Sequence, residues 1–286
     1  MRRTLPDFKA RAARHQAQLG EAGALRLLQA GRAWNLAPVL QAGGSILFPH
    51  TTLAVCGHQI ASAVHACLHS GAQRVIVLGV LHALTEEMAQ ARARVAEGAD
   101  PANEPAWGLQ GPGMPARQDW RAEFSLDHFL FLWEHAVKQQ GTPAPELVVR
   151  YPCLVGDSPD RLPGIDALQE QAQGAVVVAT MDPFHHGIGY GDSPQTALLP
   201  EAGGLALARE RIAEGMELLR RGDYAGYLRH CVRSRSDGRD VGPVLRYLLG
   251  PVEGEILDLL ADDMTGPYQA QAPTWVAGAL LALHKA

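Results

Sequence analysis

The chain has 286 residues, 47% of them hydrophobic, and its 25 basic and 30 acidic side chains give a formal net charge of −5 at pH 7. This size and composition suit one large α/β domain, and the acidic excess argues against a nucleic-acid-binding protein. No apolar stretch approaches the roughly 20 residues of a membrane-spanning helix. The four cysteines form no CxxC pair, and we expect a reduced, cytoplasmic protein without a secretion signal.

In chain order, the first feature is a helical region at 4–41, interrupted near 35–38. It defines an N-terminal helical segment, 1–42, followed by an α/β domain, 43–286. Apolar runs predict strands at 45–48, 74–80, 146–151, 175–181, 256–260 and 274–283. Helices are predicted at 57–70, 125–139 (with Ser125 as its N-cap), 162–173, 205–221, 224–231 and 241–249. This alternation predicts a single α/β domain with a mostly parallel central sheet flanked by helices.

Residues 99–118 are rich in Pro and Gly and have no clear period. A long irregular stretch in a compact domain is usually functional or mobile. Two roles stay open for it: a lid over a site, or a surface insertion.

Three loops that carry histidine each follow a predicted strand. His50 follows 45–48, His82 follows 74–80, and His185 with His186 follows 175–181. If these strands are parallel, the loops leave from the same edge of the sheet, which is where open α/β sheets bind ligands. Two histidines and one carboxylate suit a non-haem Fe(II) oxygenase, and three ligands plus water also suit zinc. The alternative is that each histidine has a structural role.

A third metal ligand has two candidates, Asp237 and Asp240, which both precede the predicted helix 241–249. A carboxylate at this position also has a simpler role, as a helix cap that complements the helix dipole. The sequence does not choose between the two aspartates.

His185 and His186 supply a candidate general base, since the unperturbed pKa of histidine lies near neutrality. We expect one of the pair to face the site and the other to pack or meet solvent. His58, His65 and His69 share one helix, where a solvated face is favoured over a second metal site. The chain contains no Walker A, GxGxxG or GxSxG motif.

Several segments resemble motifs of the Memo family, which is similar in fold to the class III extradiol dioxygenases (the LigB-like group). They span 44–284 in order and comprise FPHTTLAVCGHQIASAVHA, RVIVLGVLHAL, DHFLFLWE, TMDPFHHG, DGRD and TWVAGALLAL. The resemblance implies that His50, His82 and Asp237 are the metal ligands. It also implies that His185 is the acid/base residue of the site.

The chain departs from the family pattern at several positions. Asp237 stands where Memo proteins have cysteine and the dioxygenases have glutamate, which restores a carboxylate ligand and favours Fe(II). Ala83, Phe131 and His186 replace a histidine, a histidine and a tryptophan, so a more apolar pocket near Phe131 and a new imidazole at His186 are expected. The first forty residues do not look like the usual family start.

The function implied is that of a mononuclear non-haem Fe(II) dioxygenase, which uses O2 on a small metal-chelating substrate, aromatic or amine-bearing. The residues expected to act with the ligands are His185, His186 and Asp182 in catalysis, and Asp127, His128, Glu134 and Tyr190 in substrate contacts or orientation. The expected partners are substrate and O2, with a homodimer as an option and no nucleic acid or membrane. The rivals are a zinc hydrolase at the same ligands, a non-enzymatic Memo-like metal-binding protein, and a structural domain that binds no metal.

Overall fold

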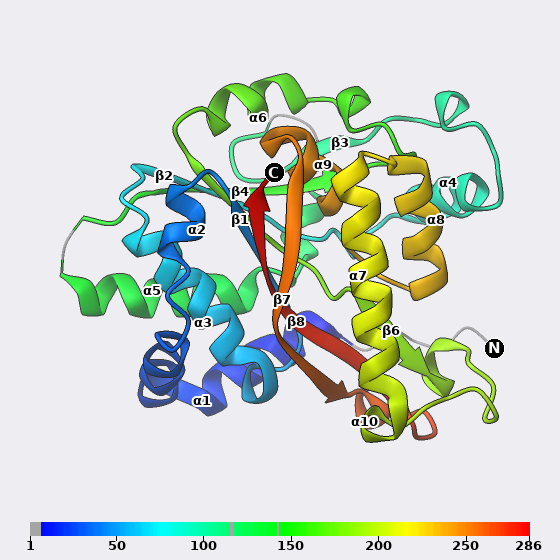
Figure 1. The fold of residues 1–286 in the computed structure, drawn as a ribbon, viewed down its shortest axis with the longest axis horizontal. Coiled ribbons are helices and arrows are strands. Elements are labelled where there is room, and N and C mark those ends of the chain that lie inside the picture. The colour runs from blue at the N-terminus through cyan, green and yellow to red at the C-terminus, as the bar shows by residue number, and fades with distance from the viewer. Residues whose placement is uncertain (1–6, 115–116, 142) are drawn as a thin grey trace.

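The computed structural model describes residues 7–114, 117–141 and 143–286. An eight-stranded mixed sheet lies at its centre, with helices on both sides (Figure 1). The strands are β1 Ser45–Phe48, β2 Arg74–Leu78, β3 Gly108–Gln110, β4 Glu146–Cys153, β5 Val176–Thr180, β6 Phe184–Gly187, β7 Val252–Asp263 and β8 Thr274–Lys285. The helices are α1 Phe8–Gly31, α2 Ala37–Gln41, α3 Leu53–His69, α4 Glu86–Ala96, α5 Asp127–Gln140, α6 Ile165–Ala172, α7 Leu205–Arg221, α8 Tyr224–Ser234, α9 Val241–Leu249 and α10 Thr265–Tyr268. The predicted α/β class is confirmed.

The sheet has a parallel centre and antiparallel margins. Its strand order is β3-β4-β2-β5-β1-β8-β6, with β7 also paired to β8. The pairs β2·β4, β2·β5 and β1·β5 are parallel, whereas the pairs that involve β3, β6, β7 and β8 are antiparallel. The carboxyl ends of β1, β2 and β5 therefore meet at one edge, as the sequence predicts.

The central strands are buried on both faces because their side chains alternate between two cores. In β1, Ile46 and Phe48 pack with α1, α3 and α5, whereas Leu47 packs with α7, α8 and α9. Strands of this kind read as continuous apolar runs. Figure 1 shows α1, α2, α3 and α5 on the left of the sheet and α7 and α8 on the right.

The helix predictions hold best where the ends carry clear signals. The bounds of α7 and α9 are those predicted. Gly222 ends α7 and Gly141 ends α5, at φ 70° and 66°, a left-handed conformation that glycine adopts without strain. Ser125 is not the cap of α5: the helix starts at Asp127, and the Ser125 hydroxyl donates to the Val80 carbonyl instead, at 2.7 Å.

Four elements are absent from the sequence prediction: α4, α10, β3 and β6. The strand β6 takes up the His185-His186 pair, which the sequence places in a loop, and it pairs with the long strand β8. Within 99–118, the strand β3 pairs antiparallel with β4. Helix α1 packs on α3 and α5 and contains a break at Gly20, where φ is 59°.

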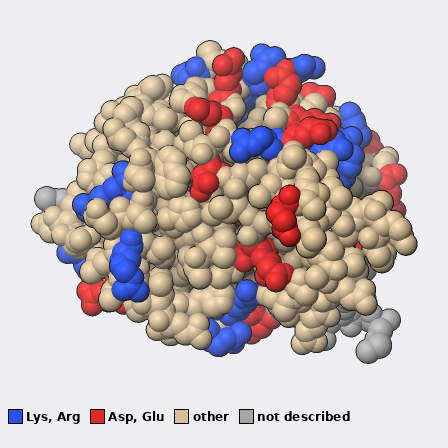
Figure 2. All heavy atoms as spheres, turned by 60° about the horizontal axis from the view of Figure 1, so that its bottom comes forward, with Lys and Arg blue, Asp and Glu red and all other residues tan. Residues whose placement is uncertain are grey.

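The surface carries charges of both signs. On the face drawn in Figure 2, Lys and Arg side chains are interspersed with Asp and Glu, and no broad basic area occurs. Within the described ranges, no helix has both the length and the apolar character that crossing a membrane requires.

Candidate metal centre

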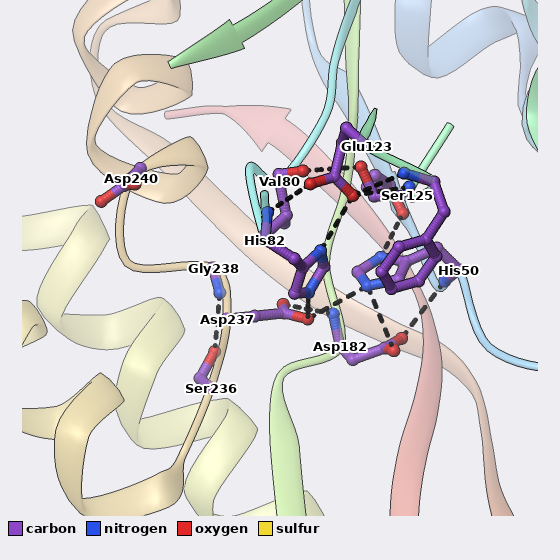
Figure 3. Close-up of polar contacts among 12 residues, drawn as sticks. His50, Val80, His82, Glu123, Ser125, Asp182, Ser236, Asp237, Gly238 and Asp240 are labelled. Carbon is purple, nitrogen blue, oxygen red and sulfur yellow. Dashed lines mark hydrogen bonds and ion pairs between the residues drawn. The ribbon is translucent and has the colours of Figure 1, made fainter. Parts of the chain in front are cut away.

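The loops after β1 and β2 and the segment between α8 and α9 bring three side chains together. The candidate ligand atoms of His50, His82 and Asp237 all lie within 4.8 Å of one another. Figure 3 shows these side chains pointing toward one another, with Asp182, from the end of β5, beside them. The structure thus places the three sequence-predicted ligands in one cluster.

His50 is held in a defined tautomer. The Thr180 hydroxyl donates its proton to the Phe48 carbonyl at 2.9 Å, and the same oxygen lies 3.0 Å from His50 Nδ1. Because the hydroxyl proton is already used, His50 Nδ1 must be the donor in the second contact. Nε2 carries the lone pair of the neutral ring and lies 3.1 Å from Asp237 Oδ2 and 3.4 Å from Asp182 Oδ2. Burial opposes protonation of His50, but these two carboxylates raise its pKa.

His82 is oriented by a carboxylate that the sequence analysis missed, Glu123. Glu123 Oε1 lies 3.0 Å from His82 Nδ1, and the Glu123 side chain is fully buried. This carboxylate also accepts backbone N–H groups from His82, Ala83, Phe124 and Ser125. Burial acts against ionisation, but His82 and these amides lower the pKa of Glu123 to about 2.

An ionised Glu123 requires a proton on His82 Nδ1, so Nε2 of His82 faces the cluster, 3.5 Å from Asp237 Oδ2. Burial opposes protonation of His82, yet the carboxylates of Glu123 and Asp237 raise its pKa to about 10. A carboxylate that fixes the far nitrogen of a histidine is the usual support of a metal-bound imidazole.

Asp237 presents the oxygen on which both imidazoles converge. Its Oδ1 accepts the Asp182 backbone N–H at 2.7 Å, which fixes the carboxylate. Oδ2 is buried and lies at ion-pair distance from the Nε2 atoms of both histidines. The neighbouring carboxylates raise the pKa of both imidazoles, so protons on the Nε2 atoms neutralise this oxygen when no metal is bound, and a divalent cation would take the place of these protons. The donor set therefore fits a divalent metal ion, with two imidazole nitrogens and one carboxylate oxygen.

Asp240 lies apart from this cluster (Figure 3). Its Oδ2 lies 3.1 Å from Arg92 Nη1, and its Oδ1 lies 3.5 Å from Arg239 Nε. Its side chain makes no capping hydrogen bond to α9. Of the two aspartates that the sequence left open, Asp237 is the one near the histidines, and Asp240 is a partner of arginines.

His185 and His186 face opposite sides of β6, because successive side chains of a strand alternate. His185 Nδ1 is buried without a partner, and burial lowers the pKa of this ring to about 4, so it is neutral near pH 7. His185 also forms a possible ligand group with Asp182 and Asp237. Asp182 accepts the His50 backbone N–H at 3.2 Å, and burial raises its pKa.

The catalytic role expected for His186 is not supported by its position. Its Nε2 accepts the Leu198 backbone N–H at 2.8 Å, and its Nδ1 lies 3.0 Å from Asp192 Oδ2. The ring packs near Phe184 and Trp275, with centroids 5.5 and 5.6 Å away. His186 is thus the packed member of the pair.

A cavity of about 420 Å³ opens onto the cluster. His128 and Tyr190 line it, as expected, together with Phe8, Phe124 and Tyr268. No described residue of 99–118 does so, which favours the surface insertion of the two roles left open for this stretch, and the helix α1 contributes to the wall instead. The sequence gives no sign of this, since α1 shows only an ordinary helical composition.

Three further residues that the sequence analysis expects near the substrate lie away from the cavity. Asp127 lies 3.6 Å from Lys9 Nζ in an ion pair, and Glu134 is exposed on α5. Phe131 packs against His135 at a centroid distance of 4.7 Å. None of the three lines the cavity. They lie on helix α5, which meets the cavity only through His128.

The remaining histidines of α3 form no further cluster with the described residues that fits a metal ion. His58 Nε2 lies 3.0 Å from Asp258 Oδ2, and its ring stacks on Trp34 at 5.5 Å. The His65 and His69 rings lie 4.0 Å apart, and His69 Nδ1 contacts the carbonyl of His65 at 2.8 Å.

His128 makes stability depend on pH. Burial, with a smaller effect of His15, lowers the pKa of His128 from 6.5 to about 3. Between about pH 3 and pH 6.5 the unfolded chain binds a proton that the folded chain excludes. The contribution of neutral His128 to the free energy of unfolding is therefore complete above pH 6.5 and is lost as the pH falls toward about 3. We expect His128→Leu to flatten the pH dependence of unfolding free energy there by up to about 1.4 kcal/mol per pH unit. Equal slopes in denaturant titrations of both proteins would contradict this.

No protein-family model matches the chain, and no curated protein matches its sequence significantly. The resemblance to the Memo family is therefore a proposal, supported by the order of the motifs and by the positions of His50, His82 and Asp237.

Proposed function

We propose that this protein is a mononuclear non-haem Fe(II)-dependent oxygenase of the extradiol-dioxygenase type. The observation that carries the proposal is the buried Asp237 Oδ2, on which the Nε2 atoms of His50 and His82 converge. Two histidines and one carboxylate, with room for further ligands, are the donor set of non-haem Fe(II) oxygenases. His50, His82 and Asp237 would hold the iron.

The bound iron would supply electron exchange with O2 and a binding point for a substrate that chelates metal. The chain's own residues do the rest. Thr180 and Glu123 keep the two imidazoles in the tautomer that presents Nε2. Aromatic side chains of the cavity exclude water from the substrate.

His185 is positioned to move a proton. Its Nδ1 is buried without a hydrogen-bond partner, and the ring lies in a group with Asp182 and Asp237. In the neutral tautomer with the proton on Nε2, Nδ1 carries a lone pair that can accept a proton from a hydroxyl or amine of the substrate. The low pKa of His185, about 4, keeps the ring neutral and makes it a ready donor once protonated.

The test needs no knowledge of the natural substrate. Protein loaded with Fe(II) without oxygen is treated with nitric oxide, a probe that binds Fe(II) at the position O2 would take. We expect a high-spin electron paramagnetic resonance signal, and oxygen uptake when a panel of catechols and aminophenols is added in air. Turnover that proceeds equally well without oxygen would overturn the proposal and favour the zinc hydrolase. Bound iron with neither the signal nor oxygen uptake would favour a non-enzymatic metal-binding protein.

A further inference from the structure

Three arginines line the cavity beside the candidate metal centre, and two of them are neutralised by aspartates. Arg235 forms two hydrogen bonds to Asp192, at 3.0 and 2.8 Å. Arg239 lies 3.5 Å from Asp240 Oδ1 and donates to the Val155 carbonyl at 3.0 Å. These two side chains are parts of the wall.

Arg11, on α1, is the third. Its Nη2 lies 3.4 Å from Thr52 Oγ1, and its Nε lies 3.5 Å from His15 Nε2, so both contacts are long. No carboxylate of the described residues forms an ion pair with Arg11. Asp262, an acidic side chain of the wall, is engaged with the backbone instead: its Oδ2 accepts the Thr52 N–H at 2.8 Å. The guanidinium therefore keeps donors available for a ligand.

Aromatic rings connect this arginine to the candidate metal centre. The Phe124 ring stacks on the His82 ring with centroids 4.7 Å apart, and Phe8 stacks on Phe124 at 5.3 Å. Phe8 and Arg11 are three residues apart on α1, so they share one face of the helix. A planar ligand along Phe124 and Phe8 would have one end at His82 and the other near Arg11.

We propose that Arg11 determines specificity by binding an anionic substituent, a carboxylate, on an aromatic substrate. The inference rests on the proposed function for the other end of the substrate, which would meet the metal centre. A guanidinium suits this task because its planar donors match a carboxylate and it stays charged at any working pH. The site lies on a helix outside the region that resembles the Memo family.

The experiment compares two probes, dihydroxybenzoate and its uncharged methyl ester, in anaerobic binding titrations. Wild type is compared with Arg11→Ala, Arg11→Lys and the control Arg14→Ala, which removes the same charge from an exposed position of α1. We expect wild type to prefer the acid and Arg11→Ala to lose about 10- to 100-fold in affinity for the acid alone. Arg11→Lys should retain part of the preference, and Arg14→Ala all of it.

Each protein is titrated both with metal and after removal of metal, which separates this proposal from the preceding one. Equal binding of acid and ester by wild type, or a preference that survives in Arg11→Ala, would overturn the role of Arg11 and leave the iron centre standing. An Arg11-dependent preference in a protein that fails to bind iron when iron is supplied would support Arg11 and overturn the proposed function. Failure of both probes to bind the metal-loaded wild type would also overturn the Arg11 proposal.

Discussion

Replacing His82 with alanine is expected to abolish stoichiometric iron binding and oxygen-dependent turnover together. The variant removes one of the two imidazole nitrogens that face Asp237 Oδ2. A site left with one histidine and one carboxylate no longer has the donor set that holds Fe(II). The measurement is iron content after anaerobic loading, followed by oxygen uptake with the catechol panel.

The matched control for this variant is His69→Ala, which removes an exposed imidazole from α3, outside the cluster. We expect it to retain iron and turnover. Far-ultraviolet circular dichroism of both variants shows whether the fold persists. Full activity in a correctly folded His82→Ala protein would contradict the ligand assignment.

Replacing Glu123 with glutamine is expected to lower both metal affinity and stability. The carboxylate accepts four backbone N–H groups and the His82 Nδ1–H, and a glutamine amide would turn an NH2 group toward some of these donors. Disturbing a buried charged group of this kind costs about 3–5 kcal/mol of unfolding free energy. The loss of support for His82 should weaken metal binding by about 10- to 100-fold.

Denaturant titrations of the metal-free protein and metal titrations of the folded protein measure these two effects separately. Glu146→Gln is the control, because Glu146 forms an exposed ion pair with Arg74 at 2.8 Å, and removal of such a pair should leave stability and metal affinity close to those of wild type. If Glu123→Gln keeps wild-type stability and metal affinity, the orienting role of Glu123 is wrong.

The sequence predicts the centre of the fold well because the signals there are local. The runs 74–80 and 175–181 are apolar on both faces, as buried parallel strands require, and β2 and β5 lie within them. The strands β3 and β6 are different, since they exist through pairing with β4 and β8 and carry little pattern of their own. Tertiary pairing, rather than propensity, determines these elements.

The residues of the candidate site also fall into those that a local pattern predicts and those that only tertiary contacts identify. His50 and His82 follow strands, so their convergence follows from topology. Asp237 and Asp240 are three residues apart, and only the conformation between α8 and α9 decides which of them meets the histidines. Glu123 and Arg11 have no local signal, because their importance comes from contacts with distant parts of the chain.

The measurement that tests the central claim most directly is the metal content of anaerobically purified protein, with wild type beside Asp237→Asn and Asp240→Asn. Asparagine at 237 keeps an acceptor for the Asp182 N–H but removes the negative charge beside the two Nε2 atoms. The account predicts stoichiometric iron in wild type and in Asp240→Asn, and its loss in Asp237→Asn. Zinc in place of iron, or iron that persists in Asp237→Asn, would contradict it.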